Sequence, residues 1–139
     1  MPELPDNNHD EARRWLRNVD DDLASMRAVQ RDADSPRRMV CFLAHLVVEK
    51  ALKATLIAAE TPFAKTHNLL ELHDTCRAAG RLPDVDRHAL QQLNPWTIDG
   101  RYADDLVEAA RGVAEHLAGF AARVVAAVHS ELGGGHGDA

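Results

Sequence analysis

The strongest candidates for chemistry are His45, Glu49 and Lys53, which follow one another at intervals of four residues in an apolar stretch. In a helix this spacing places all three side chains on one face. Lys50 stands about 100° from Glu49 around the same axis. One interpretation is a charged strip at a ligand-binding cleft. The other is a solvent-facing strip whose Glu49–Lys53 pair contributes only about 0.3–0.5 kcal/mol.

Two further places hold side chains suited to chemistry. His67 lies at an expected helix start beside Lys65, where a neutral imidazole could act as a base. A capping-region histidine with one hydrogen bond is the alternative. Arg101 and Tyr102 follow Trp96, and an arginine beside aromatic residues can hold a phosphate or carboxylate through two hydrogen bonds. Arg101 could equally attach a loop to the carboxyl end of a helix.

Several well-known site patterns are missing from the sequence. It contains no ExxH pair, HExxH, GxGxxG, GxSxG or phosphate-binding loop, so those metal, nucleotide and serine-hydrolase sites are not expected. Cys41 and Cys76 have no CxxC partner, which argues against a disulfide scaffold and a structural zinc site. We therefore expect no metal and no cofactor. His116 is flanked by apolar positions, and we interpret it first as a structural residue.

Length and composition predict one helical domain. The 139 residues are rich in alanine and leucine and only 4% are aromatic, a composition that favours helices over strands. The net charge of −6 argues against a general nucleic-acid coat protein, which needs a basic face. No signal sequence or membrane-spanning run is visible, and we expect a cytoplasmic protein without membrane contact.

Apolar periodicity predicts the elements that must position the candidate residues. The expected helices cover residues 10–31, 36–60, 66 or 68 to 80, 84–94 and 102–132, the last being the longest. Ser35 before Pro36, Asn68 before Glu71, and Gly80 are the expected helix-end signals. The sequence therefore predicts an all-α, antiparallel four- to five-helix bundle over residues 9–132, with flexible tails at 1–8 and 133–139.

Charge is distributed unevenly along this chain. Residues 35–80 hold six basic and four acidic residues, a net charge of +2, whereas residues 1–34 and 81–139 each carry −4. The basic segment contains His45, Glu49, Lys53 and His67. This pattern is compatible with a small anionic ligand or a short RNA contact.

Three motifs stand out along the chain: the stretch CFLAHLVVEKALKA at residues 41–54, KTHNL at residues 65–69, and Arg101-Tyr102. In this order, the three motifs resemble those of the HEPN domain family. Together with Trp15 they extend the resemblance over about residues 10–130. It implies a small helical bundle that is usually a homodimer, often partnered by a minimal nucleotidyltransferase and often acting in toxin–antitoxin or defence systems.

Some HEPN proteins are metal-independent ribonucleases that use an arginine and a histidine with four to six residues between them, placed at the dimer cleft near the start of the last helix. No histidine follows Arg101 in that window, where Leu106, Val107 and Glu108 stand. Arg111 and His116 have a suitable spacing, but five residues on a helix separate two side chains by about 140°.

We therefore expect first a dimeric module that binds a nucleotide, an RNA phosphate or a partner nucleotidyltransferase and is not a ribonuclease of the usual kind. Its expected ligand-binding residues are Glu49, Lys50, Lys53, His67, Arg101 and Tyr102. The second interpretation is an endoribonuclease toxin in which an arginine stabilises the phosphorane and a histidine is the general base; the candidates are Arg101, Arg111, His67 and His116. The third is a structural adaptor without a ligand.

Overall fold

A computed structural model shows how the predicted helices pack. The structure describes residues 6–82, 84–97 and 108–134, and within these ranges it contains five helices and no strands. The helices are α1 (Asp6–Arg31), α2 (Arg37–Ala58), α3 (Leu69–Ala78), α4 (Arg87–Leu93) and α5 (Arg111–Gly134). The predicted all-α bundle is confirmed.

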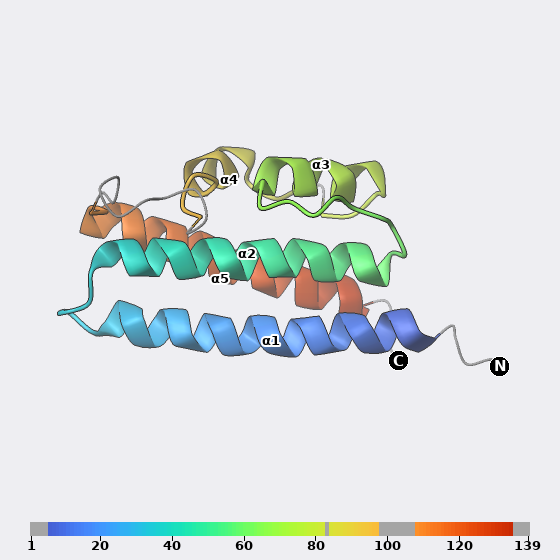
Figure 1. The fold of residues 1–139 in the computed structure, drawn as a ribbon, viewed down its shortest axis with the longest axis horizontal. Coiled ribbons are helices and arrows are strands. Elements are labelled where there is room, and N and C mark those ends of the chain that lie inside the picture. Colours follow the sequence, from blue (N-terminus) through green and yellow to red (C-terminus); the bar gives the residue numbers. More distant parts are fainter. Residues whose placement is uncertain (1–5, 83, 98–107, 135–139) are drawn as a thin grey trace.

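Helix α2 occupies the centre of the bundle. It lies antiparallel to α1 on one side, with α5 behind it and α3 and α4 above it in Figure 1, and it contacts all four of these helices. Most of its residues are buried, as expected for a helix that is apolar around most of its circumference. The candidate residues on α2 are thus positioned by the best-packed element of the fold.

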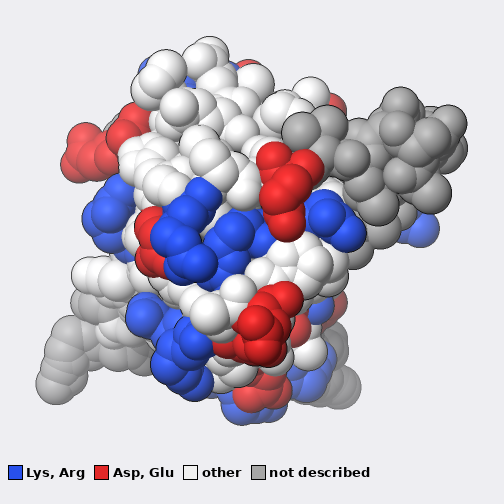
Figure 2. All heavy atoms as spheres, turned by 90° about the vertical axis from the view of Figure 1, so that its left-hand side faces the viewer, with Lys and Arg blue, Asp and Glu red and all other residues white. Residues whose placement is uncertain are grey.

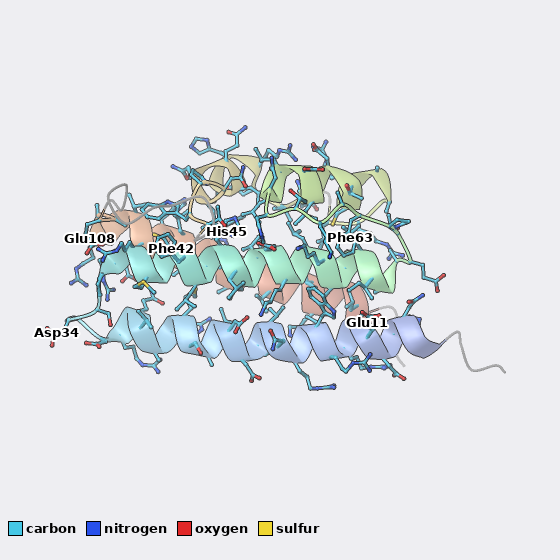
Figure 3. The ribbon with its side chains drawn as sticks, in the orientation of Figure 1. Glu11, Asp34, Phe42, His45, Phe63 and Glu108 are labelled. Atoms are coloured by element: carbon cyan, nitrogen blue, oxygen red, sulfur yellow. The ribbon has the colours of Figure 1, made fainter. Side chains whose placement is uncertain are left out.

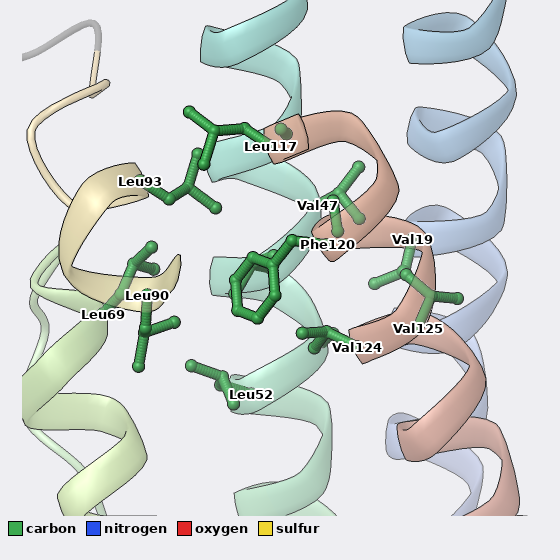
Figure 4. Close-up of a cluster of buried hydrophobic side chains, with 14 of the residues drawn as sticks. Val19, Val47, Leu52, Leu69, Leu90, Leu93, Leu117, Phe120, Val124 and Val125 are labelled. Carbon is green, nitrogen blue, oxygen red and sulfur yellow. The ribbon is translucent and has the colours of Figure 1, made fainter. Parts of the chain in front are cut away.

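The hydrophobic core joins the three long helices to the α3–α4 layer. Phe120 of α5 lies at its centre, close to Val47 and Leu52 of α2 (Figure 4), and all three side chains are almost completely buried. Leu69 and Leu90 bring α3 and α4 into the same cluster. Burying side chains of this size stabilises a fold by about 1.5–3 kcal/mol each.

Local signals predicted the ends of α3 correctly. The side chain of Asn68 accepts hydrogen bonds from the backbone N–H groups of Leu70 and Glu71, which makes it the N-cap. Gly80 follows the helix with φ +76°, the left-handed conformation that glycine adopts without strain. Both expectations are confirmed.

The expectation for the start of α2 was wrong. Pro36, and not Ser35, is the N-cap, and it offers no side-chain hydrogen bond. The Ser35 hydroxyl instead donates to the Asp32 carboxylate at 3.0 Å. The missing hydrogen-bond acceptor comes from a residue 70 positions later in the chain. The Glu108 carboxylate accepts the backbone N–H of Arg38 at 2.8 Å.

The expected start of the last helix was also wrong. Residues 108–110 are not helical and α5 begins at Arg111, while residues 102–107 lie outside the described part of the chain. Glu108 explains the non-helical segment, since its carboxylate binds the amino end of α2 and the backbone N–H of Ala109. The hydrogen bond from Arg38 is the main cause that lowers the pKa of Glu108. At 26 residues α1, and not α5 with 24, is the longest described helix.

Candidate functional site

The three polar residues spaced along α2 do not form a solvent-facing strip. Only 2% of His45 and 6% of Glu49 is exposed, and 13% of the Lys53 side chain reaches solvent. His45 lies between α2 and the α3–α4 layer (Figure 3). The interpretation as an exposed ion-pair strip is therefore wrong, and the polar ladder faces neighbouring elements.

Glu49 is the centre of a polar group that we call the Glu49 cluster, formed by His45, Glu49, Lys53 and His67. The Glu49 carboxylate accepts hydrogen bonds from Lys53 Nζ at 2.9 Å and from His67 Nδ1 at 2.9 Å. His45 Nδ1 lies 3.6 Å from Glu49 Oε1. A buried carboxylate requires compensating donors of this kind, and the cluster supplies two.

The position of His67 follows from the loop between α2 and α3. The hydroxyl of Thr66 accepts the backbone N–H of Asn68, and Asn68 caps α3, so the residue between them is held at the helix start. Because a carboxylate only accepts hydrogen bonds, His67 Nδ1 carries a proton in this contact, and Nε2 is the ring nitrogen that points away from Glu49. About half of the His67 side chain is exposed. The cluster thus orients an imidazole at its open edge.

His45 is the buried end of the cluster. Its Nε2 atom has no hydrogen-bond partner among the residues that the structure describes. Burial lowers the pKa of His45, against the opposing effects of the Glu49 carboxylate and of backbone groups of His67 and Asn94. His45 is therefore a neutral imidazole near pH 7.

The other expected ligand residues are not in this cluster. Lys50 donates to the side chains of Asn18 and Asp22 on α1, so it connects α1 to α2. Arg101 and Tyr102, expected at the same site, lie outside the described residues. The structure brings together Glu49, Lys53 and His67 of the predicted set.

The alternative catalytic pair is not brought together by α5. Arg111 and His116 are both exposed, and His116 Nε2 lies 3.2 Å from Gln92 Oε1 on α4. Their separation along the helix leaves them on different faces, as the 140° between them predicts. Any shared role would need a second molecule.

Sequence reasoning missed two polar residues that connect elements of the bundle, one beside the cluster and one at the turn between α1 and α2. Asn94, at the end of α4, accepts the backbone N–H of Leu69 at 2.8 Å and so ties α4 to the start of α3. Arg37 is only 7% exposed, and its guanidinium donates to backbone carbonyls of Val29, Gln30, Asp32 and Ser35. An arginine just after a helix end can bind the last carbonyls of that helix, but nothing in the sequence distinguishes Arg37 from Arg38.

His73 is a second histidine that is buried in the bundle. His73 Nε2 donates to the carbonyl of Leu82 at 2.9 Å, and its Nδ1 accepts from Arg87 at 3.0 Å. Burial lowers the pKa of His73, and the charge of Arg87 lowers it further. This network joins α3 to α4 and requires a neutral ring.

We expect the protein to lose stability as the pH falls below the ordinary histidine pKa of 6.5, because the unfolded chain then binds protons that the buried rings of His45 and His73 do not. The free energy of unfolding should fall by up to about 1.4 kcal/mol per pH unit for each ring. Urea unfolding between pH 5 and 8 measures this slope. His73→Gln should reduce the slope, and the exposed His88 provides a control in His88→Gln. An equal slope in wild type and His73→Gln would contradict this assignment.

The comparisons with known proteins identify the fold family. A family model described as HEPN domain matches residues 12–131. Neither the search of curated proteins nor the search of solved structures found a match. Among the described helices none is long and apolar enough to cross a membrane, and among the described residues no group of three or more His, Cys, Asp or Glu side chains is arranged so that it could hold a metal ion. The matched range includes all of α2, α3 and α4 and most of α1 and α5, and the chain belongs to the HEPN domain family.

Proposed function

We propose that this HEPN chain is a dimerising module whose Glu49 cluster binds a phosphate group of a nucleotide or an RNA. The observation that carries the proposal is the convergence of Lys53 Nζ and His67 Nδ1 on one carboxylate, each at 2.9 Å. This arrangement holds an ammonium group and an imidazole side by side at the open edge of a buried site. Lys53 keeps two further N–H donors beyond the one that Glu49 accepts.

Local charge supports a small anionic ligand over an extended nucleic-acid surface. The segment of residues 35–80, which contains the cluster, has a net charge of +2 in a chain of −6. Figure 2 shows the end of the molecule where α1 ends and α2 begins, and basic and acidic side chains are intermingled there. Phosphate binding at a single cluster needs no continuous basic face.

Binding of a fluorescein-labelled decauridylate at low salt tests the phosphate site. Lys53→Gln should weaken binding about tenfold, since hydrogen bonds to charged groups contribute about 1.5–3 kcal/mol, and Lys53→Arg should retain it. His67→Ala should also weaken binding, and its half-exposed side chain makes unfolding a minor concern. The exposed Lys65 provides a matched control in Lys65→Gln. Equal affinity of Lys53→Gln and Lys65→Gln would overturn the proposal.

The dimer part of the proposal is supported by one incompletely covered side of α2. Leu43, Leu46 and Ile57 lie there with Lys50 and Lys53 at steps of three and four residues, and none of the five is fully buried. Met39, one turn earlier, is 37% exposed. A second copy would cover this apolar side. Sedimentation of the binding samples should give the mass of two chains, and Leu46→Glu should give one.

The Glu49–His67 hydrogen bond favours a second candidate function, cleavage of RNA with His67 as general base. A carboxylate that fixes the Nδ1 tautomer leaves Nε2 as the atom that accepts a proton. The decauridylate recovered after incubation in EDTA distinguishes the two functions. Intact RNA supports the binding module, whereas cleavage that is lost in His67→Ala would support the ribonuclease.

The family resemblance extends the proposal to a partner. We place the module in a toxin–antitoxin or defence system, with a minimal nucleotidyltransferase as the protein that it binds. Co-expression of this chain with such a nucleotidyltransferase, followed by purification through a tag on one of them, tests the complex. Recovery of the tagged chain alone would remove the partner from the proposal.

A further inference from the structure

A groove between α5 and the segment that joins α3 to α4 shares no lining residue with the Glu49 cluster. Its volume is about 500 Å³, which is within the range of small-molecule sites. Its apolar lining consists mainly of Leu82, Val85, Phe120 and Val124. Leu82, Phe120 and Val124 are almost completely buried members of the hydrophobic core, so they form the floor of the groove. This floor suits an aliphatic or aromatic side chain.

Contacts around the groove hold its two walls together. Arg81 Nη1 of the α3–α4 segment lies 3.3 Å from Glu131 Oε2 of α5, and this ion pair connects one wall to the other. His73 Nε2 of α3 donates to the carbonyl of Leu82 at 2.9 Å, and Arg87 Nη1 of α4 donates to His73 Nδ1 at 3.0 Å. The α3–α4 segment is thereby attached to three helices. The groove is formed before a ligand binds, which lowers the entropic cost of binding.

The backbone of Leu82 is strained where it lines this groove. Its φ is 50°, in the left-handed region that bulky side chains rarely adopt. Strained residues persist where the surrounding contacts over-determine their conformation, and they concentrate at functional sites. The buried hydrogen bond from His73 is such a contact. The strain at Leu82 is thus a feature, independent of the charges in the groove, that favours a ligand at this place.

The charged groups of the groove fall into two sets. Asp86 accepts the first backbone N–H groups of α4 as its N-cap, and Glu131 is paired with Arg81. Asp84 on the segment and Arg123 on α5 form no ion pair or hydrogen bond with any residue in the described ranges. These two groups have opposite charges and come from opposite walls. They leave one anionic and one cationic contact available to a ligand.

We propose that this groove binds a zwitterion with an apolar side chain, the chemistry of a free amino acid or a dipeptide. The guanidinium of Arg123 binds the carboxylate through two N–H groups, and Asp84 accepts hydrogen bonds from the ammonium group. The apolar side chain lies on the floor of the groove. The inference goes beyond the proposed function and does not depend on phosphate binding at the Glu49 cluster.

Isothermal titration calorimetry of the full chain with L-phenylalanine and with glycyl-L-phenylalanine tests the groove. The two probes carry the same side chain and differ in the distance between their charges. Saturable binding of L-phenylalanine identifies a free amino acid as the ligand, and saturable binding of the dipeptide alone identifies a short peptide. The analogues 3-phenylpropionate and 2-phenylethylamine each lack one charge, and each should bind about fivefold more weakly than the zwitterion.

Variants of Arg123 and Asp84 locate the ligand. Arg123→Gln and Asp84→Asn should each weaken binding about fivefold. The exposed controls Arg17→Gln and Asp34→Asn should not weaken it. Lys53→Gln should also leave it unchanged, because Lys53 belongs to the other site. Wild-type affinity in Arg123→Gln or Asp84→Asn, or no saturable binding of either probe at millimolar concentrations, would overturn the proposal. A failure of decauridylate binding alone would overturn only the phosphate-binding function.

Discussion

Glu49→Ala is expected to lower the free energy of unfolding by about 3 kcal/mol, because removing one partner of a buried ion pair leaves the other charge without compensation. The Glu49 carboxylate is the acceptor for both Lys53 and His67, and only 8% of its side chain is exposed. Lys53, at 13% exposure, would retain its charge in a poorly hydrated place. Urea denaturation of wild type and variant at pH 7.5 measures the loss.

Two comparisons distinguish a lost charge partner from lost packing. The double variant Glu49→Ala with Lys53→Met should recover at least half of the stability, since a buried pair replaced by apolar groups is often neutral. Asp10→Ala removes a carboxylate from the exposed Arg13–Asp10 pair and should cost less than about 1 kcal/mol. A Glu49→Ala protein as stable as Asp10→Ala would show that the cluster does not contain a buried charge pair.

Arg37→Ala is expected to cost about 2–3 kcal/mol. The guanidinium donates to four backbone carbonyls where α1 ends, including that of Asp32 at 2.7 Å, and hydrogen bonds to charged donors contribute more than neutral ones. The aligned peptide dipoles of α1 also favour a positive charge at its carboxyl end. Thermal and urea unfolding measure the change.

The neighbouring Arg38 supplies the matched control for Arg37. Its side chain is 30% exposed and lies 3.9 Å from Glu108, so Arg38→Ala should cost less than about 1 kcal/mol. Arg37→Lys should recover little, because an ammonium group cannot reach several carbonyls with the planar fork of a guanidinium. Equal stability of the two alanine variants would contradict the assigned role of Arg37.

Predictions from the sequence succeeded where the determining interaction is local. Asn68 and Gly80 act on atoms within three residues of themselves, so their sequence neighbours suffice to predict the ends of α3. The beginning of α5 failed for the opposite reason. Glu108 binds the backbone of Arg38, 70 residues away in the chain. Helical periodicity relates only residues three or four positions apart, so it could not predict this contact.

For the candidate site too, the sequence predicted the local arrangement of the residues but not their long-range contacts. The intervals between His45, Glu49 and Lys53 are enough to place these residues on one face of a helix, and the motifs around them identified the family. Which way that face points was open in the sequence. The packing of the α2–α3 loop and of α4 over α2 buries His45 and brings His67 to Glu49.

The sequence by itself determined the helices, their order, one basic segment and membership of the HEPN family, because these follow from periodicity and from residues close together in the chain. Only the tertiary structure decided that Glu49 is a buried acceptor shared by Lys53 and His67. It also decided that Lys50 binds Asp22 of α1 and takes no part in the Glu49 cluster. The physical reason is that burial and long-range hydrogen bonds depend on which surfaces meet. That information exists only once the helices are packed.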